Sequence, residues 1–124
     1  MRRALFLLAL LATSALAEPS AEEMARRARE SLAADSAYEM VAVKAFWGDA
    51  AFLQICAPQD RPAPAPFVIY FEVLRSGELG ATVFEPLTDV GKCIKAQTVR
   101  RTFPSPPTAG YVIKIAMSFA HDGV

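Results

Sequence analysis

The segment Phe67–Leu74 constrains the fold of this chain more than any other part of its sequence. It is rich in β-branched and aromatic residues, whose side chains suit a pleated, half-buried surface. Because successive side chains of a strand point to opposite faces, one face of this segment would be wholly apolar. That face, which we predict to be buried, carries Phe67, Ile69, Phe71 and Val73; the other carries Val68, Tyr70, Glu72 and Leu74. The sequence therefore predicts a β-strand packed on a hydrophobic core.

Residues 75–101 predict a hairpin return followed by a helix. Gly77 can adopt the positive φ of a tight turn, and Leu79–Glu85 then reads as a second strand with Gly80 as a candidate bulge. Pro86 ends this strand, and a side-chain oxygen at position 88 or 89, from Thr88 or Asp89, would cap the helix. The apolar residues that share a helical face are Leu87, Val90 and Ile94. Basic residues gather at the expected C-terminal end, where they complement the helix dipole: Lys92, Lys95, Arg100 and Arg101.

A third strand is predicted from the alternation that runs from Tyr111 to Phe119. The proline-rich residues 103–107 separate it from the helix, since proline lacks an N–H and clashes with the preceding helical turn. We expect the face that includes Tyr111 to meet the core. That face carries Tyr111, Ile113, Ile115, Met117 and Phe119.

Taken together, residues 67–119 resemble the TonB C-terminal-like domain, in particular its divergent periplasmic branch with a single cysteine in the helix. The resemblance lies in the glycine-containing hairpin, the helix with the sequence GKCI, the FP-x-PP break and the last amphipathic strand. It implies a ββαβ core in which a helix covers one face of a three-stranded antiparallel sheet. It also implies a periplasmic protein without catalytic residues that binds other envelope proteins, in some relatives by adding a strand to a sheet edge.

The last strand is our candidate for such an edge, because an edge strand exposes unpaired N–H and C=O groups. The partner-binding residues would be Tyr111, Val112, Ile113, Lys114 and Ile115.

Residues 1–17 have the pattern of a secretory signal peptide. Arg2 and Arg3 precede an apolar run, and Ala15-Leu16-Ala17 offers a small-x-small cleavage site. An uncleaved anchor is the alternative, but the apolar run is about half the ~20 residues that a spanning helix needs. Cleavage would remove two basic residues from a chain with 13 basic and 13 acidic ones, so the mature chain has no basic excess. We therefore expect a periplasmic protein without nucleic-acid binding and without membrane insertion after cleavage.

Residues 18–58 read as a helical region. Ser20 and Glu23 form a capping box at the start of a helix over residues 18–34, and we expect ion pairs Glu22–Arg26 and Glu23–Arg27 on its solvated face. Residues 37–47 fit neither a helical nor a strand period fully, and we favour a helix. Asp49 would cap a short helix over residues 50–56. The proline-rich residues 59–66 form a stiff connector, and residues 120–124 a tail.

Two cysteines, Cys56 and Cys93, survive the predicted cleavage. An even number in an exported chain favours a disulfide, which would close an interval of 37 residues. The alternatives are two separate buried thiols or a redox role, although no C-x-x-C pair is present. With a single distant histidine, the cysteines make too few ligands for zinc, so we expect no metal.

No constellation of catalytic residues stands out in the sequence. His121 lies near the C-terminus, where it is better explained as a solvated tail residue than as the base of a Cys93–His121 pair. An aromatic platform for stacking bases is a second alternative, but its residues fall on the predicted core faces: Phe67, Phe71, Tyr111 and Phe119. We expect neither a catalytic site nor a cofactor.

The sequence thus predicts an α+β protein in which N-terminal helices precede a ββαβ, TonB C-terminal-like core. The expected function is that of a soluble periplasmic, non-catalytic protein-binding or accessory module of the cell envelope. Its partner would be an unidentified envelope protein or a second copy in a homodimer. The alternatives are a self-associating structural envelope protein and a small secreted enzyme or inhibitor.

Overall fold

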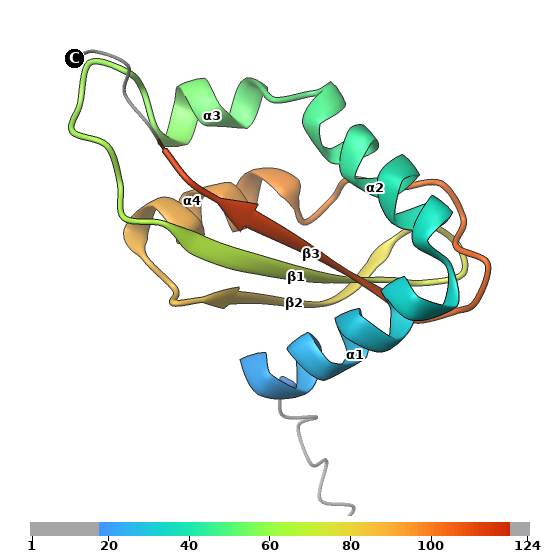
Figure 1. The fold of residues 1–124 in the computed structure, drawn as a ribbon. Helices are drawn as coiled ribbons and strands as arrows, with labels where there is room; N and C mark the ends of the chain where they lie inside the picture. Colours follow the sequence, from blue (N-terminus) through green and yellow to red (C-terminus); the bar gives the residue numbers. More distant parts are fainter. Residues whose placement is uncertain (1–17, 120–124) are drawn as a thin grey trace, which may run out of the picture.

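The computed structural model describes residues 18–119, and this part of the chain forms four helices and three strands (Figure 1). The predicted signal peptide and His121 lie outside these residues. In chain order the elements are α1 (Ala21–Ala34), α2 (Ser36–Gly48), α3 (Ala51–Cys56), β1 (Phe67–Val73), β2 (Leu79–Glu85), α4 (Asp89–Thr98) and β3 (Tyr111–Met117). The fold class is therefore α+β, as the sequence predicts.

The three strands form one antiparallel sheet in the order β2-β1-β3, so that β1 is central. Ile69 of β1 lies opposite Phe84 of β2 on one side and Ile115 of β3 on the other. The register between β1 and β2 shifts after Phe71, and the irregularity falls at the predicted bulge glycine, Gly80. The sheet leaves β2 and β3 as its two edges.

The β1–β2 hairpin turns at Gly77, which has a φ of 92°. The backbone N–H of Phe103 donates to the carbonyl oxygen of Gly77 at 2.8 Å. A Cβ atom on Gly77 would lie 2.2 Å from the backbone oxygen of Phe103, so a side chain has no room there. The turn is thus locked by the loop that leads into β3 as well as by its own φ requirement.

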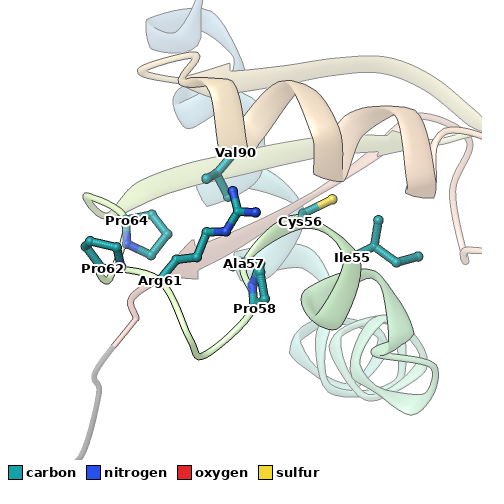
Figure 2. Close-up of a pocket in the computed structure, with 8 residues that line it drawn as sticks. All are labelled: Ile55, Cys56, Ala57, Pro58, Arg61, Pro62, Pro64 and Val90. Carbon is teal, nitrogen blue, oxygen red and sulfur yellow. The ribbon is translucent and has the colours of Figure 1, made fainter.

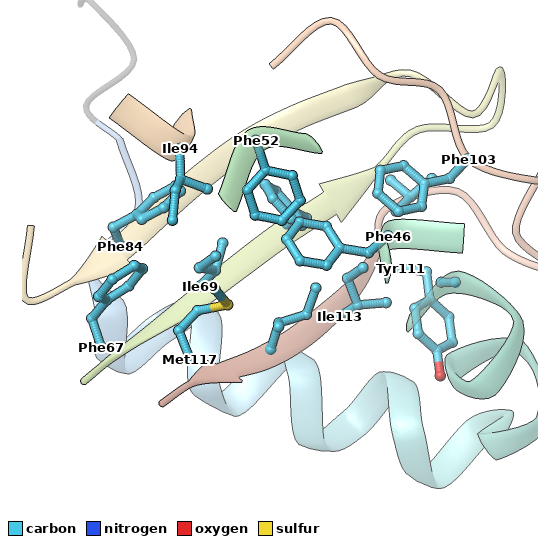
Figure 3. Close-up of a cluster of buried hydrophobic side chains, with 14 of the residues drawn as sticks. Phe46, Phe52, Phe67, Ile69, Phe84, Ile94, Phe103, Tyr111, Ile113 and Met117 are labelled. Atoms are coloured by element: carbon cyan, nitrogen blue, oxygen red, sulfur yellow. The ribbon is translucent and has the colours of Figure 1, made fainter. Parts of the chain in front are cut away.

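The predicted core face of the sheet is buried under α2, α3 and α4 (Figure 3). The ring of Phe46 on α2 lies 5.1 Å from that of Phe52 on α3 and 5.7 Å from that of Phe71 on β1. Ile94 of α4 is fully buried in the same cluster. The sheet contributes the residues predicted for it: Phe67, Ile69, Phe71, Val73, Tyr111, Ile113, Ile115 and Met117. The aromatic residues considered as a stacking platform are therefore packing residues.

The opposite face of the sheet is also covered, because α1 packs across it (Figure 1). Met24 and Ala28 of α1 form a second buried cluster with Tyr70, Val83 and Val112 from the three strands. The sequence predicted a helical region before the sheet but not which face it would cover; α1 covers the face opposite α4. The small residues of α1 let this helix approach the sheet closely. Met24 is fully buried and supplies most of the apolar contact.

Helix α1 starts as predicted, but its ion pairs differ from the predicted ones. Ser20 caps the helix by accepting the backbone N–H of Glu23 at 3.0 Å. Arg26 pairs with Glu23 and Glu30 on the solvated face. Arg27 instead reaches across to the sheet, where its Nη2 lies 2.7 Å from Oε2 of Glu72. The i,i+4 rule failed at Arg27 because a long-range carboxylate on the covered sheet face offers a more buried partner.

Residues 36–48 form a helix, α2, which resolves the ambiguity in the sequence pattern. The side chain of Asp35 accepts the N–H of Tyr38 at 3.1 Å and so caps this helix. At its other end Arg101 donates to the carbonyl oxygens of Phe46 and Ala45 at 2.9 and 3.1 Å. The sequence predicted that Arg101 would stabilise the C-terminus of α4. It stabilises the C-terminus of α2 instead.

A disulfide joins Cys56 at the end of α3 to Cys93 in α4, with Cα atoms 5.6 Å apart. The prediction of this pair is confirmed, and neither cysteine is free. Thr88 caps α4 by accepting the N–H of Gly91 at 3.0 Å. Of the predicted apolar face of α4, Ile94 is buried and Leu87 is exposed, because Leu87 precedes the helix.

Candidate functional site

The strand predicted as a partner-binding edge, β3, does lie at an edge of the sheet. Its first half, however, has its outward backbone groups occupied. The N–H of Val112 donates to Oγ of Ser31 on α1 at 3.0 Å. Since outward and inward groups alternate along a strand, the N–H groups of Lys114 and Ala116 also point away from β1.

Glu39 of α2 occupies the next outward position. Its carboxylate faces the backbone N–H of Lys114 and the hydroxyl of Tyr111. The Oε1 atom of Glu39 is buried without a hydrogen-bond partner among the described residues. The Tyr111 hydroxyl itself donates to the backbone oxygen of Asp35 at 2.6 Å. Two helices thus take the place of a neighbouring strand along the first half of β3.

The electrostatics of this corner follow from its burial. Burial raises the pKa of Glu39, and its interactions with the Lys114 N–H and the Tyr111 hydroxyl oppose that rise. Burial, followed by the nearby carboxylates of Glu39 and Asp35, raises the pKa of Tyr111 to about 12. Tyr111 therefore stays a neutral hydrogen-bond donor at physiological pH, and the corner is a structural junction.

The second half of β3 is open. Ala116 is exposed, and within residues 18–119 no hydrogen bond from another element reaches its outward N–H or C=O. The outward carbonyl of Lys114 and the exposed Ser118 flank it. We refer to residues 114–118 as the open edge. This stretch offers the main-chain groups that an added strand needs.

The other sheet edge, β2, is closed along its middle by burial. Tyr70 of β1 and Val83 of β2 form a pair whose backbone N–H and C=O groups point toward each other. Because the direction alternates along a strand, the N–H and C=O groups of Thr82 and Phe84 point away from the sheet. Both of these residues are only 5% exposed, so little of their outward backbone is accessible to a partner strand, whereas Ala116 at the open edge is exposed.

A groove beside the open edge runs between α1, α2 and β3. Its volume is about 240 Å³, and its lining residues are Ala25, Ala28, Arg29, Leu32, Glu39 and Lys114. The floor is apolar, since Leu32 is 45% exposed above two alanines. Lys114 belongs both to the groove and to the open edge, so the two features are continuous.

A second depression, of about 360 Å³, lies between the end of α3, the proline-rich connector and the start of α4 (Figure 2). It is lined mainly by apolar side chains: Ile55, Cys56, Ala57, Pro58, Arg61, Pro62, Pro64 and Val90. Cys56 is no nucleophile while it is bonded to Cys93. The lining of this depression therefore offers an apolar surface and one cation, but no pair of groups suited to acid–base or nucleophilic chemistry.

Two further properties concern residues 18–119 as a whole. No three His, Cys, Asp or Glu side chains come together there in a way that could hold a metal ion. None of the helices in this range is both long enough and apolar enough to cross a membrane.

The structure divides the five residues predicted as a binding edge. Val112 and Lys114 have their N–H groups turned toward α1 and α2, while the side chains of Tyr111, Ile113 and Ile115 enter the core. Ala116, the centre of the open edge, was missed by sequence reasoning. The only available signal was that Ala116 lies two residues after Lys114 and so shares the strand face that is not predicted to be buried. Partner binding at this strand stays a prediction.

Comparison of the chain with known protein families, with curated proteins and with solved structures gives no match.

Proposed function

We propose that this chain is a non-catalytic protein-binding module of the cell envelope that captures an extended segment of another envelope protein at the open edge of β3. The observation that carries the proposal is the exposed, unpaired backbone of Ala116 at the end of an otherwise covered strand. Such an edge binds a partner through main-chain hydrogen bonds, which require no catalytic side chain.

The proposed compartment is the periplasm. The disulfide between Cys56 and Cys93 supports it, since such bonds persist in oxidising compartments. The signal-peptide pattern of residues 1–17 supports it independently. Export is tested by determining the N-terminus of the protein recovered from the periplasm, which should be Glu18.

The TonB C-terminal-like resemblance of residues 67–119 belongs to the same proposal. The order β1, β2, α4, β3 agrees with what that resemblance implies, and a strand-adding family would use an edge of this kind. The helix α1 on the second sheet face, with Ser31 and Glu39 at the strand edge, is a feature that the resemblance does not imply.

Proline at position 116 tests strand addition directly. The Ala116→Pro variant loses the outward N–H but no hydrogen bond to β1, and edge strands tolerate proline at such positions. The matched control, Ala116→Val, keeps the N–H and adds a side chain suited to strands.

In an affinity capture from the envelope fraction, the wild-type protein and Ala116→Val should retain the same proteins and Ala116→Pro should lose them. Thermal unfolding would establish that all three proteins are folded. Retention of the same proteins by folded Ala116→Pro would overturn the proposal.

Self-association is a second candidate, and a different surface favours it. Helix α2 carries large apolar residues beside Lys44 on its outer side as well as on its buried side, with Met40 74%, Val41 48% and Trp47 39% exposed. A cluster of exposed apolar residues on one helix is often covered by a partner. Sedimentation velocity at increasing protein concentration would test this candidate; a constant monomer would reject it. No described side-chain cluster favours the remaining alternative of a small secreted enzyme or inhibitor.

A further inference from the structure

The groove beside the open edge has an uncompensated positive charge. Arg29 and Lys114 line it, and neither makes an ion pair within the described residues. The neighbouring arginines of α1 differ in this respect, since Arg26 is paired with Glu23 and Glu30 and Arg27 with Glu72. The two cations that face the groove are thus the ones left for a ligand.

Glu39 is the one carboxylate in the groove lining, and its position limits its effect on a ligand. Its Oε1 atom is buried, and the carboxylate is directed at the backbone N–H of Lys114 and at Tyr111. Against this one carboxylate the groove lining sets two exposed cations, Arg29 and Lys114, so its positive charge is in excess. A ligand lying across the groove therefore meets the side chains of Arg29 and Lys114 first.

The apolar part of the groove selects a second property of the ligand. Leu32 is a large aliphatic side chain on a helix whose other apolar contacts are made by Met24 and small residues. It lies exposed beside Ala25 and Ala28, in reach of a ligand side chain on the same side of the sheet. Burial of an aliphatic side chain there would be favourable by roughly 25 cal/mol for each Å² removed from water.

We propose that the ligand of the open edge is an extended acidic peptide in which an aliphatic residue and a carboxylate residue stand two positions apart. In a strand added to β3, side chains at i and i+2 lie on the same face, here the face that carries Lys114, Ala116 and α1. The aliphatic side chain would contact Leu32, and the carboxylate would lie between Arg29 and Lys114. This inference rests on the proposed function, because it needs the strand addition that presents the side chains.

The test uses labelled peptides of about eight residues, a typical strand length, that alternate valine and threonine and differ at one central position. That position replaces a central valine, so that a valine stands two residues away, and it is glutamate, glutamine or lysine. Fluorescence anisotropy with the full mature chain should show the glutamate peptide binding most tightly and the lysine peptide about three- to tenfold more weakly, a gap that shrinks with salt. Equal affinity for the three peptides would overturn the inference.

Charge reversal in the groove sharpens the test. Arg29→Glu and Lys114→Glu should each reverse the order of the glutamate and lysine peptides. The control is Lys92→Glu on α4, which makes the same change in net charge at an exposed residue without an ion pair among residues 18–119, away from the groove. An unchanged order in both groove variants, or a reversed order in the control, would show that the groove does not read the charge.

Ala116→Pro separates this inference from the proposed function. If it abolishes binding of all three peptides while the groove variants leave their order unchanged, strand addition stands and the acidic preference fails. If the glutamate peptide still prefers wild-type groove charges but binds Ala116→Pro normally, the proposed function fails, and this inference fails with it. Loss of binding in Ala116→Pro together with reversal in the groove variants supports both.

Discussion

The two faces of the sheet are both buried, but they are built differently. The face under α2, α3 and α4 is packed with large aromatic and aliphatic side chains and is tied together by the Cys56–Cys93 disulfide. The face under α1 has a small cluster around Met24 and an ion pair, Arg27–Glu72, whose side chains are 25% and 21% exposed. The first face therefore contributes most of the core that stabilises the fold. The second face binds α1, the helix that covers part of the β3 edge.

This difference places the proposed binding surface on the less extensively packed side. Helix α1 supplies the cap on Val112 through Ser31 and the floor and one cation of the groove through Leu32 and Arg29. The apolar cluster beneath it is smaller than the aromatic core on the other face. Substitutions on the two faces should therefore separate loss of the fold from loss of the groove.

The largest expected effect is on the aromatic face. Ile113 is fully buried there, and Ile113→Asp would place an unpaired charge among apolar side chains. We expect loss of cooperative unfolding, measured by thermal denaturation followed by circular dichroism. A cooperative transition near that of the wild type would show that this face does not carry the fold.

The disulfide on the same face should come next. Cys56→Ser releases a closed interval of 37 residues, for which the loss of stability is about 3–4 kcal/mol. Denaturant unfolding would measure this loss, and a thiol reagent should label Cys93 in the variant only. The Cys93→Ser variant should match it within error; two different losses would mean that packing, not the cross-link, dominates.

On the α1 face, Met24→Ala should cost about 2–5 kcal/mol, since a fully buried side chain leaves a cavity. We expect the effect to be local: hydrogen exchange should accelerate in α1 and not in α4. Leu32→Ala, on an exposed side chain of the same helix, is the control and should leave exchange unchanged. Equal acceleration in α1 and α4 would remove the distinction between the faces.

The smallest effect is expected at Glu72, where it depends on pH. Burial alone would raise the pKa of Glu72, but the N–H of Ala81 and the guanidinium of Arg27 hold it below the ordinary value of 4.5. The stabilisation is therefore fully present above that value and is lost as the pH falls through the lower, folded-state pKa.

Glu72→Gln should cost about 1 kcal/mol at pH 7 and progressively less below pH 4.5. Denaturant unfolding of both proteins across this range measures the difference. Glu39 has a raised pKa, so its contribution to stability changes with pH in the opposite direction. Because Glu39 is present in both proteins, subtracting their free energies of unfolding cancels that contribution. A loss that grew toward acid pH would contradict the ion-pair account.

Local sequence pattern predicted much of the fold. The alternation in residues 67–74 and 111–119 identified both core faces correctly, because a strand side chain's direction is fixed by its neighbours along the chain. Gly77 and Ser20 were identified for the same reason, and the cap of α4 was narrowed to Thr88 or Asp89, since turn and cap geometry are local. The disulfide could be predicted because only two cysteines were available.

The tertiary structure alone decided the candidate site. Three of its contacts join residues far apart in the sequence. Arg27 and Glu72 are separated by 45 residues, Arg101 and its partner Phe46 at the end of α2 by 55, and Ser31 and Val112 by 81. A side chain's long-range partner depends on how elements pack, and no spacing along the chain encodes it. The sequence by itself therefore determined which residues form the strands and their core faces, whereas only the packing of α1 and α2 decided which half of β3 stays open.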